Sequence, residues 1–263
     1  MNKPEAPLTT GEARARALDR LDATPRFNEH NAVRLNRMFR GSSTQEMLEG
    51  VIGGDLAGDV ATVSSFGAES VVLLHLLAEV DPGIPVLFLE TGKHFAETLR
   101  YRDEVVERLG LTNLINLTPD IVELAEKDES GLRWSYDPDG CCEIRKVKPL
   151  AQALARYDAS FTGRKAFQSQ TRANLPRFEI DNSDAQGRLK INPLIDWSAE
   201  DIAAYFAAHD LPRHPLVARG FPSIGCEPCT HKVAPGEDPR SGRWKGWDKT
   251  ECGIHKPGEE PFL

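Results

Sequence analysis

Between residues 59 and 120, short apolar runs alternate with longer stretches in which apolar residues recur at helical spacing. The short runs are rich in Val, Leu and Ile, which is typical of buried strands, and the longer ones have the period of amphipathic or buried helices. Strands that alternate with helices predict a mostly parallel, doubly wound sheet in a three-layer α/β/α fold. The expected strands are residues 59–64, 85–89 and 114–117, and the expected helices span 70–80, about 95–109 and a segment that Pro119 opens.

The pattern continues less regularly towards the C-terminus. Residues 160–163 are expected to form a further strand. Residues 191–194 and a helix over 198–208 are expected to close the sheet. Ser198 is suited to be the N-cap of that helix, with Asp201 at its third position.

Residues 1–50 are polar and helix-prone, and we expect helices there that pack on the sheet or on a neighbouring subunit. We therefore expect three parts: an N-terminal helical segment (1–50), an α/β domain (51–229) and a C-terminal tail (230–263) rich in Gly, Pro, Lys and Trp. The apolar residues at helical spacing in the first part are Leu18, Leu21, Val33, Leu35 and Phe39.

Two loops follow expected strands directly. Ligands of doubly wound sheets bind at the carboxyl ends of the strands, where the loops 64–69 and 90–92 fall. A Ser/Gly turn before a helix favours an anion, because free backbone N–H groups converge there. The loop 64–69 (SSFGAE) matches neither the Walker pattern nor the dinucleotide fingerprint, so by itself it is equally consistent with an ordinary turn.

Four of the five cysteines form two close pairs, Cys141 with Cys142 and Cys226 with Cys229, and Cys252 stands apart. A disulfide between adjacent residues is strained, so bridges are the least favoured interpretation. The residues around the first pair are typical of a helix start, where the helix dipole favours thiolates. A four-cysteine set suits zinc or an iron–sulfur cluster, and a vicinal pair is unusual for structural zinc.

Composition narrows the class of protein. The chain has 263 residues, 40% hydrophobic and 27% charged, with a net charge of -8, so nothing suggests nucleic-acid binding. The N-terminus has no apolar run and no segment is long enough to span a bilayer, so with an odd cysteine count we expect reduced thiols and a cytoplasmic location. Residues 231–256 carry six Lys or Arg against four acids, a local excess that suits an anionic substrate.

The order of these motifs resembles the assimilatory adenylyl-sulfate (APS) reductases of the APS/PAPS reductase family, from about Val60 to His255. Those enzymes have an adenine nucleotide α-hydrolase-like fold. The motifs that carry the resemblance are SSFGAE after the first strand, LETG, CC-x-IRK, TGRK, GCEPC, R-x-GR and ECGIH.

The resemblance implies an oxidoreductase of sulfate assimilation that reduces APS to sulfite and AMP with thioredoxin. Cys252 would be the catalytic nucleophile and would carry an S-sulfocysteine intermediate. A 4Fe-4S cluster would be held by Cys141, Cys142, Cys226 and Cys229. The implied substrate contacts are Ser64, Ser65, Gly67, Ala68, Glu69, Leu89, Thr91, Gly92, Lys146, Arg164, Lys165, Arg240, Arg243 and His255.

The chain departs from the family pattern where Ala166 follows Arg164 and Lys165, since many relatives have another basic residue there. Ser70 replaces an acid that some relatives carry. On local evidence alone, Arg164, Lys165 and Arg172 also fit a solvated surface, and Trp244 and Trp247 fit simple packing.

Other functions remain open at this stage. A PAPS reductase, or an enzyme that uses both nucleotides, is the nearest rival, although PAPS-specific members typically lack the two cysteine pairs. An ATP pyrophosphatase of the same fold would have an S-G-G-x-D-S loop in place of SSFGAE. A non-enzymatic iron–sulfur sensor or zinc module would not need Cys252. The oligomeric state is undetermined.

Overall fold

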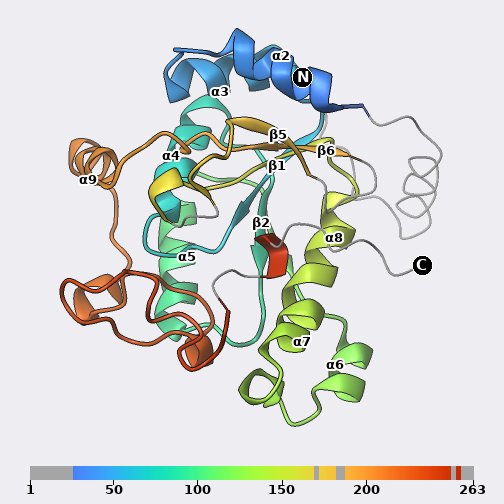
Figure 1. Ribbon diagram of the computed structural model, residues 1–263, viewed down its shortest axis with the longest axis vertical. Coiled ribbons are helices and arrows are strands. Elements are labelled where there is room, and N and C mark those ends of the chain that lie inside the picture. The colour runs from blue at the N-terminus through green and yellow to red at the C-terminus, as the bar shows by residue number, and fades with distance from the viewer. Residues whose placement is uncertain (1–25, 169–171, 182–186, 250–252, 256–263) are drawn as a thin grey trace.

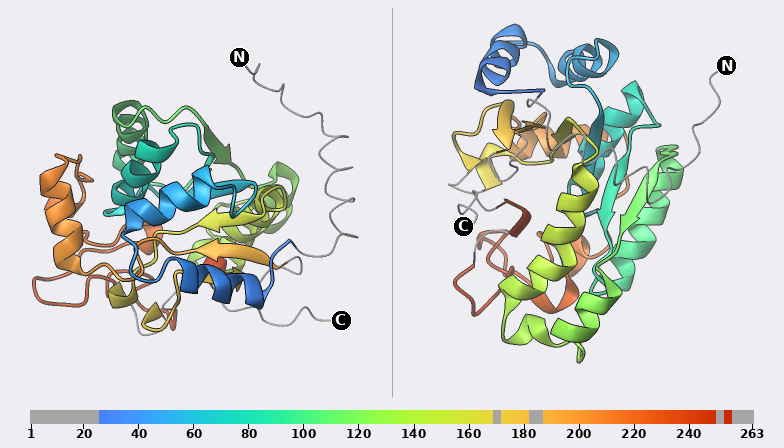
Figure 2. Two further views of the ribbon diagram at one scale, coloured as in Figure 1. Left: turned by 90° about the horizontal axis from the view of Figure 1, so that it is seen from above. Right: turned by 90° about the vertical axis from the view of Figure 1, so that its right-hand side faces the viewer.

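A six-stranded sheet with helices on both faces organises the described residues, 26–168, 172–181, 187–249 and 253–255 of a computed structural model (Figures 1 and 2). The strand order is β3-β2-β1-β4-β6-β5, with every neighbouring pair parallel except the antiparallel β5 and β6. The expected mostly parallel sheet is therefore confirmed. The strands are β1 (Val60–Ser64), β2 (Val86–Leu89), β3 (Leu114–Leu117), β4 (Ala159–Phe161), β5 (Phe178–Asp181) and β6 (Arg188–Ile191).

The helices follow the order that the sequence predicts. They are α2 (Glu29–Met38), α3 (Thr44–Gly53), α4 (Ser70–Val80), α5 (Ala96–Arg108), α6 (Ile121–Lys127), α7 (Pro138–Cys142), α8 (Lys148–Leu154) and α9 (Ala199–Ala208). Short turns of other helix types are η1 (Arg133–Ser135), the π-helical η2 (Glu143–Val147), η3 (Ala166–Gln168), η5 (Val217–Arg219), η6 (Glu227–Cys229) and η7 (Gly253–His255). Within these ranges, no helix is both long and apolar enough to cross a membrane.

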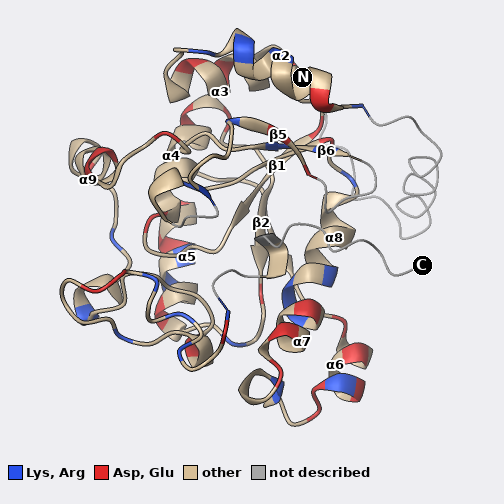
Figure 3. Ribbon diagram, viewed as in Figure 1, with Lys and Arg blue, Asp and Glu red and all other residues tan. Residues whose placement is uncertain are grey.

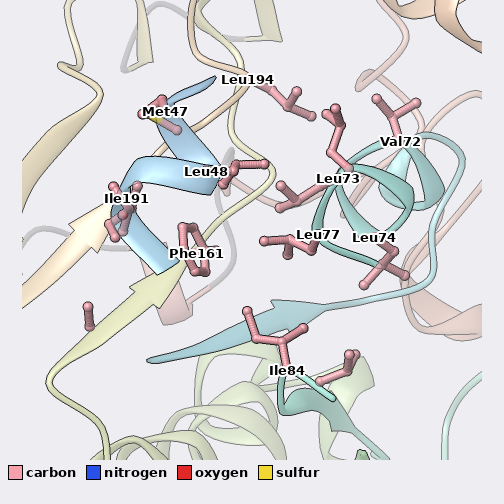
Figure 4. Close-up of a cluster of buried hydrophobic side chains, with 14 of the residues drawn as sticks. Met47, Leu48, Val72, Leu73, Leu74, Leu77, Ile84, Phe161, Ile191 and Leu194 are labelled. Carbon is pink, nitrogen blue, oxygen red and sulfur yellow. The ribbon is translucent and has the colours of Figure 1, made fainter. Parts of the chain in front are cut away.

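Alternate residues of the central strands face two separate hydrophobic clusters, as a three-layer fold requires. Val86 and Phe88 of β2 belong to the larger cluster, with side chains from α3, α4, α5 and α9. Leu87 and Leu89 face the opposite side and pack with Leu150 of α8. Figure 4 shows the part of the larger cluster in which side chains of α3 and α4 meet those of β4 and β6.

Of the two helices before the sheet, α2 covers the β5 edge and α3 packs against α4. Leu35 and Phe39 are buried as expected, whereas Val33 is exposed. The side-chain amide of Asn36 donates to the carbonyl of Phe178 (2.7 Å) and accepts from its N–H (3.1 Å). This side chain thus satisfies the backbone of an edge strand, which would otherwise be open to pairing with another chain. Leu18 and Leu21 lie outside the described residues.

Two expectations about the second half of the sheet are wrong. No strand was expected at β5. The expected strand over 191–194 is absent, because β6 ends at Ile191, the residue at which the expected strand begins. Pro193 has no N–H to donate to a ladder, and Ile195 N–H bonds Asn192 O in a turn instead. Ser198 does cap α9, in a capping box with Asp201.

Candidate active site

The two cysteine pairs, 84 positions apart at their nearest members, meet at one pocket beside the carboxyl end of β2. α7 ends with Cys141 and Cys142, and Cys226 and Cys229 bracket the turn η6. The four thiols form no disulfide with one another. The pocket is lined by Lys93, Trp134, Pro138, Cys141, Cys142, Arg145, Lys146, Cys226, Pro228, Cys229 and Trp244.

The first pair is placed by a tight helix start. The Asp137 carboxylate accepts from Gly140 N–H (2.8 Å) and caps α7, while it also pairs with Arg133 (2.7 Å). A Cβ on Gly140 would lie 2.1 Å from Asp137 Oδ2. A side chain at this position would displace the Asp137 and Arg133 side chains that order the turn, and the expected helix start at this point is confirmed.

The second pair is placed by the loop after β2. The backbone N–H of Glu227 bonds the Lys93 carbonyl (2.7 Å), and His94 forms a β-bridge with Cys226. Thr91 Oγ1 lies 3.4 Å from Cys226 Sγ. Of the residues expected near the substrate adenosine, buried Thr91 thus contacts the cysteine pocket, whereas Gly92 is exposed and adopts a positive φ of 67°.

Burial controls the chemistry of the free thiols. It raises the pKa of Cys141, and the neighbouring Cys226 thiol adds to this, although Arg145 and Lys146 act in the opposite direction. Burial and the Cys226 thiol likewise raise the pKa of Cys229 to about 11. The expected dipole stabilisation of thiolates is outweighed at Cys141, so metal binding here must displace protons.

A buried ion pair supports the pocket wall. Arg145 Nη2 lies 2.6 Å from Asp128 Oδ2, and its Nη1 donates to the Thr91 carbonyl (2.8 Å). Burial opposes ionisation of Asp128, but the bonds from Arg145 and from Arg133 N–H hold its pKa below the usual value. Arg145 Nε is buried and has no partner among the described atoms. Neither residue was expected at the site from the sequence, although Arg145 directly precedes Lys146.

The loop 64–69 turns sharply at the end of β1. Phe66 has a positive φ of 47°, an unfavourable conformation for an aromatic residue, and its buried ring packs edge-on against Phe88. A Cβ on Gly67 would lie 3.3 Å from the Ile224 carbonyl, so little room remains there. Ser64 is buried, Ser65 is exposed, and Ala68 and Glu69 are half-buried, so the loop presents a mixed surface at the predicted edge.

The basic residues after β4 are buried, so a solvated face is the wrong interpretation for them. Arg164 pairs with Glu179 and donates to Asn192 Oδ1 (2.8 Å from Nη2). Lys165 pairs with Glu69 (2.9 Å), and burial lowers the Lys165 pKa although Glu69 opposes this effect. Arg172 is buried too. Lys165 therefore connects this segment to the loop 64–69, while Arg164 contacts the sheet edge.

The described part of the C-terminal tail packs on the same pocket. Arg243 forms a β-bridge with Thr230, and its guanidinium lies 4.5 Å from the Trp244 ring centroid. Trp244 is buried, as a packing role predicts, whereas Trp247 is exposed. Arg240 is half-buried in a preceding turn. Cys252 and the side chain of His255 lie outside the described residues.

Comparison with known proteins agrees with this arrangement. The phosphoadenosine phosphosulfate reductase domain model matches residues 59–232. The chain is 54% identical to an adenosine 5'-phosphosulfate reductase of Chelativorans sp. over 203 residues, 77% of this chain and 81% of that one. It is 54% identical over 205 residues to the enzyme of that name from Mesorhizobium japonicum (78% and 79%) and 44% over 233 to that from Rhodococcus opacus (85% and 93%).

The fold is shared with a solved structure as well. A phosphoadenylyl-sulfate (PAPS) reductase from Candida auris superposes with a TM-score of 0.66 at 24% identity, covering 80% of this chain and 100% of that one. The expected α/β fold of adenine nucleotide α-hydrolase type is thereby confirmed. With a domain model that spans most of the sheet and relatives that match over three-quarters of the chain or more, this protein belongs to the phosphoadenosine phosphosulfate reductase family.

Proposed function

We propose that the chain reduces adenosine 5'-phosphosulfate to sulfite and AMP in sulfate assimilation. The observation that carries this proposal is 54% identity to relatives named for that reaction, together with a family domain model whose range, residues 59–232, contains both cysteine pairs. The gathering of the pairs at the carboxyl edge of the sheet supports it, because nucleotides bind doubly wound folds at that edge.

A 4Fe-4S cluster is the proposed occupant of the cysteine pocket, held by the two pairs. Within the described ranges, no three His, Cys, Asp or Glu side chains converge closely enough to hold one metal ion. A structural zinc needs all four sulfurs about 2.3 Å from a single point, whereas a cluster takes each sulfur on a different iron. Four cysteines that include a vicinal pair fit a cluster better than structural zinc, and the neighbouring Arg145 and Lys146 suit an anionic centre.

The cluster would supply a fixed charge and a structural brace beside Lys146, with no electron transfer required. Substrate binding is assigned to the loop 64–69, to Lys165 beside it, and to Arg240, Arg243 and His255 of the tail. Cationic side chains at these places would stabilise the charge that develops on the departing phosphate.

Cys252 is the proposed nucleophile. Its thiolate attacks the sulfur of the phosphosulfate, a new S–S bond forms, the S–O bond breaks, and AMP leaves with the electron pair of that bond. A dithiol protein of the thioredoxin type then attacks the Cys252 sulfur and releases sulfite. Its second thiol resolves the mixed disulfide, so the two electrons come from the dithiol. Reduced thiols and a dithiol partner suit the cytoplasm, which is the location we propose.

Turnover of two nucleotides with reduced thioredoxin tests this proposal. We expect sulfite from APS at a much higher kcat/KM than from PAPS. Cys252→Ser should keep the visible absorbance, iron and sulfide of the purified protein but abolish sulfite formation, whereas Cys226→Ser should lose both. A preference for PAPS would contradict the substrate, and sulfite formation by Cys252→Ser would contradict the nucleophile.

A further inference from the structure

One lysine of the tail joins the C-terminal segment to the helix of the first cysteine pair. Lys249 Nζ lies 2.6 Å from Asp139 Oδ1, and the Lys249 side chain is only 4% exposed. Its ammonium also lies 5.5 Å from the centroid of the Trp244 ring. Asp139 stands two residues before Cys141 in α7, so the ion pair spans 110 positions of sequence.

The turn that carries Lys249 is itself tied to the second cysteine pair. Trp244 N–H donates to the Cys229 carbonyl (3.1 Å), Trp247 N–H to the Trp244 carbonyl, and Lys249 N–H to the Trp247 carbonyl (both 2.9 Å). Trp244 has a positive φ of 49°, which a tryptophan adopts only where its surroundings impose it. The segment from Trp244 to Lys249 is thus held by the Cys229 carbonyl of the second cysteine pair and by Asp139, which stands two residues before the first pair.

The chain is anchored again just beyond positions 250–252, which lie outside the described residues. A Cβ on Gly253 would lie 3.1 Å from Val147 Cγ2 and 3.9 Å from Cys142 Cβ, so η7 sits against η2 and the first cysteine pair. Ile254 packs against the smaller hydrophobic cluster, which contains Leu89 and Leu150, and Figure 1 shows η7 beside β2 and α8. Lys249 therefore marks the first of two attachments that flank Cys252 in the sequence.

We infer that Lys249 is a positioning residue: its ion pair with Asp139, stacked on Trp244, fixes the C-terminal segment relative to the cysteine pocket and thereby sets the reactivity of Cys252. One part of the inference rests on the proposed function, namely that sulfite formation depends on this placement of the segment. Charge distribution agrees, since α6 and α7 carry several acidic residues in Figure 3 while the described tail adds Lys and Arg.

The expected size of the effect on Cys252 depends on how far the Lys249–Asp139 ion pair is exposed to solvent. Asp139 is 57% exposed, so water and salt screen the pair, whereas the ammonium is almost fully enclosed by protein. We therefore expect changes of about two- to fivefold, which is the upper part of the range of partly exposed pairs, and not complete loss.

The test measures the rate at which iodoacetamide alkylates Cys252, read by mass spectrometry of its peptide, together with kcat and KM for APS. The variants are Lys249→Gln, Asp139→Asn, their combination, the conservative Lys249→Arg, and Lys245→Gln as an exposed control four positions away. The visible spectrum and thermal midpoint of each variant report on the cysteine pocket and on folding.

In Lys249→Gln and in Asp139→Asn, Cys252 should be alkylated about two- to fivefold faster and kcat should fall by a similar factor, with KM within about twofold. The double variant should be no worse than either single one. Lys249→Arg should stay near wild type, as should Lys245→Gln. Unchanged or slower alkylation in Lys249→Gln, or an equal effect of Lys245→Gln, would overturn the inference. Failure of the proposed function would give a different result. Cys252→Ser would still form sulfite, while the Lys249 and Asp139 variants would still differ from wild type in the alkylation of Cys252.

Discussion

At two glycines of the active-site region, the missing side chain leaves space for an arginine, and neither position needs an unusual backbone conformation. A Cβ on Gly140 would lie 2.2 Å from Arg133 Nη2, and one on Gly225 would lie 2.2 Å from Arg243 Nη2. Neither glycine has a positive φ, so the constraint at both positions is space. In each case the residue beside a cysteine lacks a side chain because a guanidinium packs directly against it.

Gly225→Ala should displace the Arg243 guanidinium without replacing the neighbouring Cys226. If Arg243 contacts the phosphosulfate, the loss of one charged hydrogen bond, about 1.5–3 kcal/mol, should lower kcat/KM for APS by roughly tenfold or more. Steady-state kinetics with the iron content of the same samples measure this. Gly53→Ala, where no atom lies within 4 Å of the new Cβ, is the control and should remain within about twofold. Equal kinetics for the two variants would contradict a role for Arg243.

Residue spacing predicts part of this site and misses the rest for a physical reason. The cysteine pairs were predicted to act together because thiols at such spacing have few other uses in a reduced compartment. Arg164 was interpreted as a substrate ligand or as surface, yet it is buried against Glu179. Its partner lies on a strand that the pattern did not reveal. Buried charge pairs depend on which elements become neighbours, and local sequence does not carry that information.

At the scale of elements, most of the predicted strands lie inside the sheet, although the predicted strand β3 is a partly exposed edge strand. β1, β2 and β4 lie inside the sheet and are strongly apolar, so their sequences reveal them. β5 is a four-residue edge strand with two acids, and its strand character comes from pairing with β6 and from the cover provided by α2. β5 is therefore specified by tertiary contacts more than by its own residues.

Asn36→Ala should remove the side-chain cover of that edge. Its amide bonds both the N–H and the carbonyl of Phe178, so truncation leaves two partly buried backbone groups unpaired and should lower the free energy of unfolding by about 1–3 kcal/mol. Urea unfolding followed by circular dichroism measures the change. Gln45→Ala is the matched control, because the Gln45 amide bonds only exposed Glu49 on the same helix. A loss equal to that of the control would show that the Asn36 bonds contribute little.

At the scale of the whole molecule, three histidines with depressed pKa values are distributed around the larger core and the β2 loop. Burial is the main cause for His75, His94 and His214, and it lowers the pKa of His214 to about 4. His214 is 1% exposed, its Nδ1 accepts from Leu216 N–H (3.2 Å), and its Nε2 lies 3.1 Å from Thr98 Oγ1. Protonation would remove the acceptor at Nδ1, so the fold requires the neutral ring.

This requirement predicts that stability falls on mild acidification. Between the ordinary His pKa of 6.5 and about 4, the unfolded chain binds a proton that folded His214 does not. Its contribution is therefore complete above pH 6.5 and is lost as the pH falls towards 4, by up to about 1.4 kcal/mol per pH unit and about 2 kcal/mol between pH 7 and pH 5. His214→Gln keeps one donor and one acceptor but cannot titrate, so its unfolding free energy should depend less on pH by that amount. The difference between the two proteins isolates His214 from His75 and His94, and parallel pH profiles would show that His214 is protonated without penalty in the folded chain.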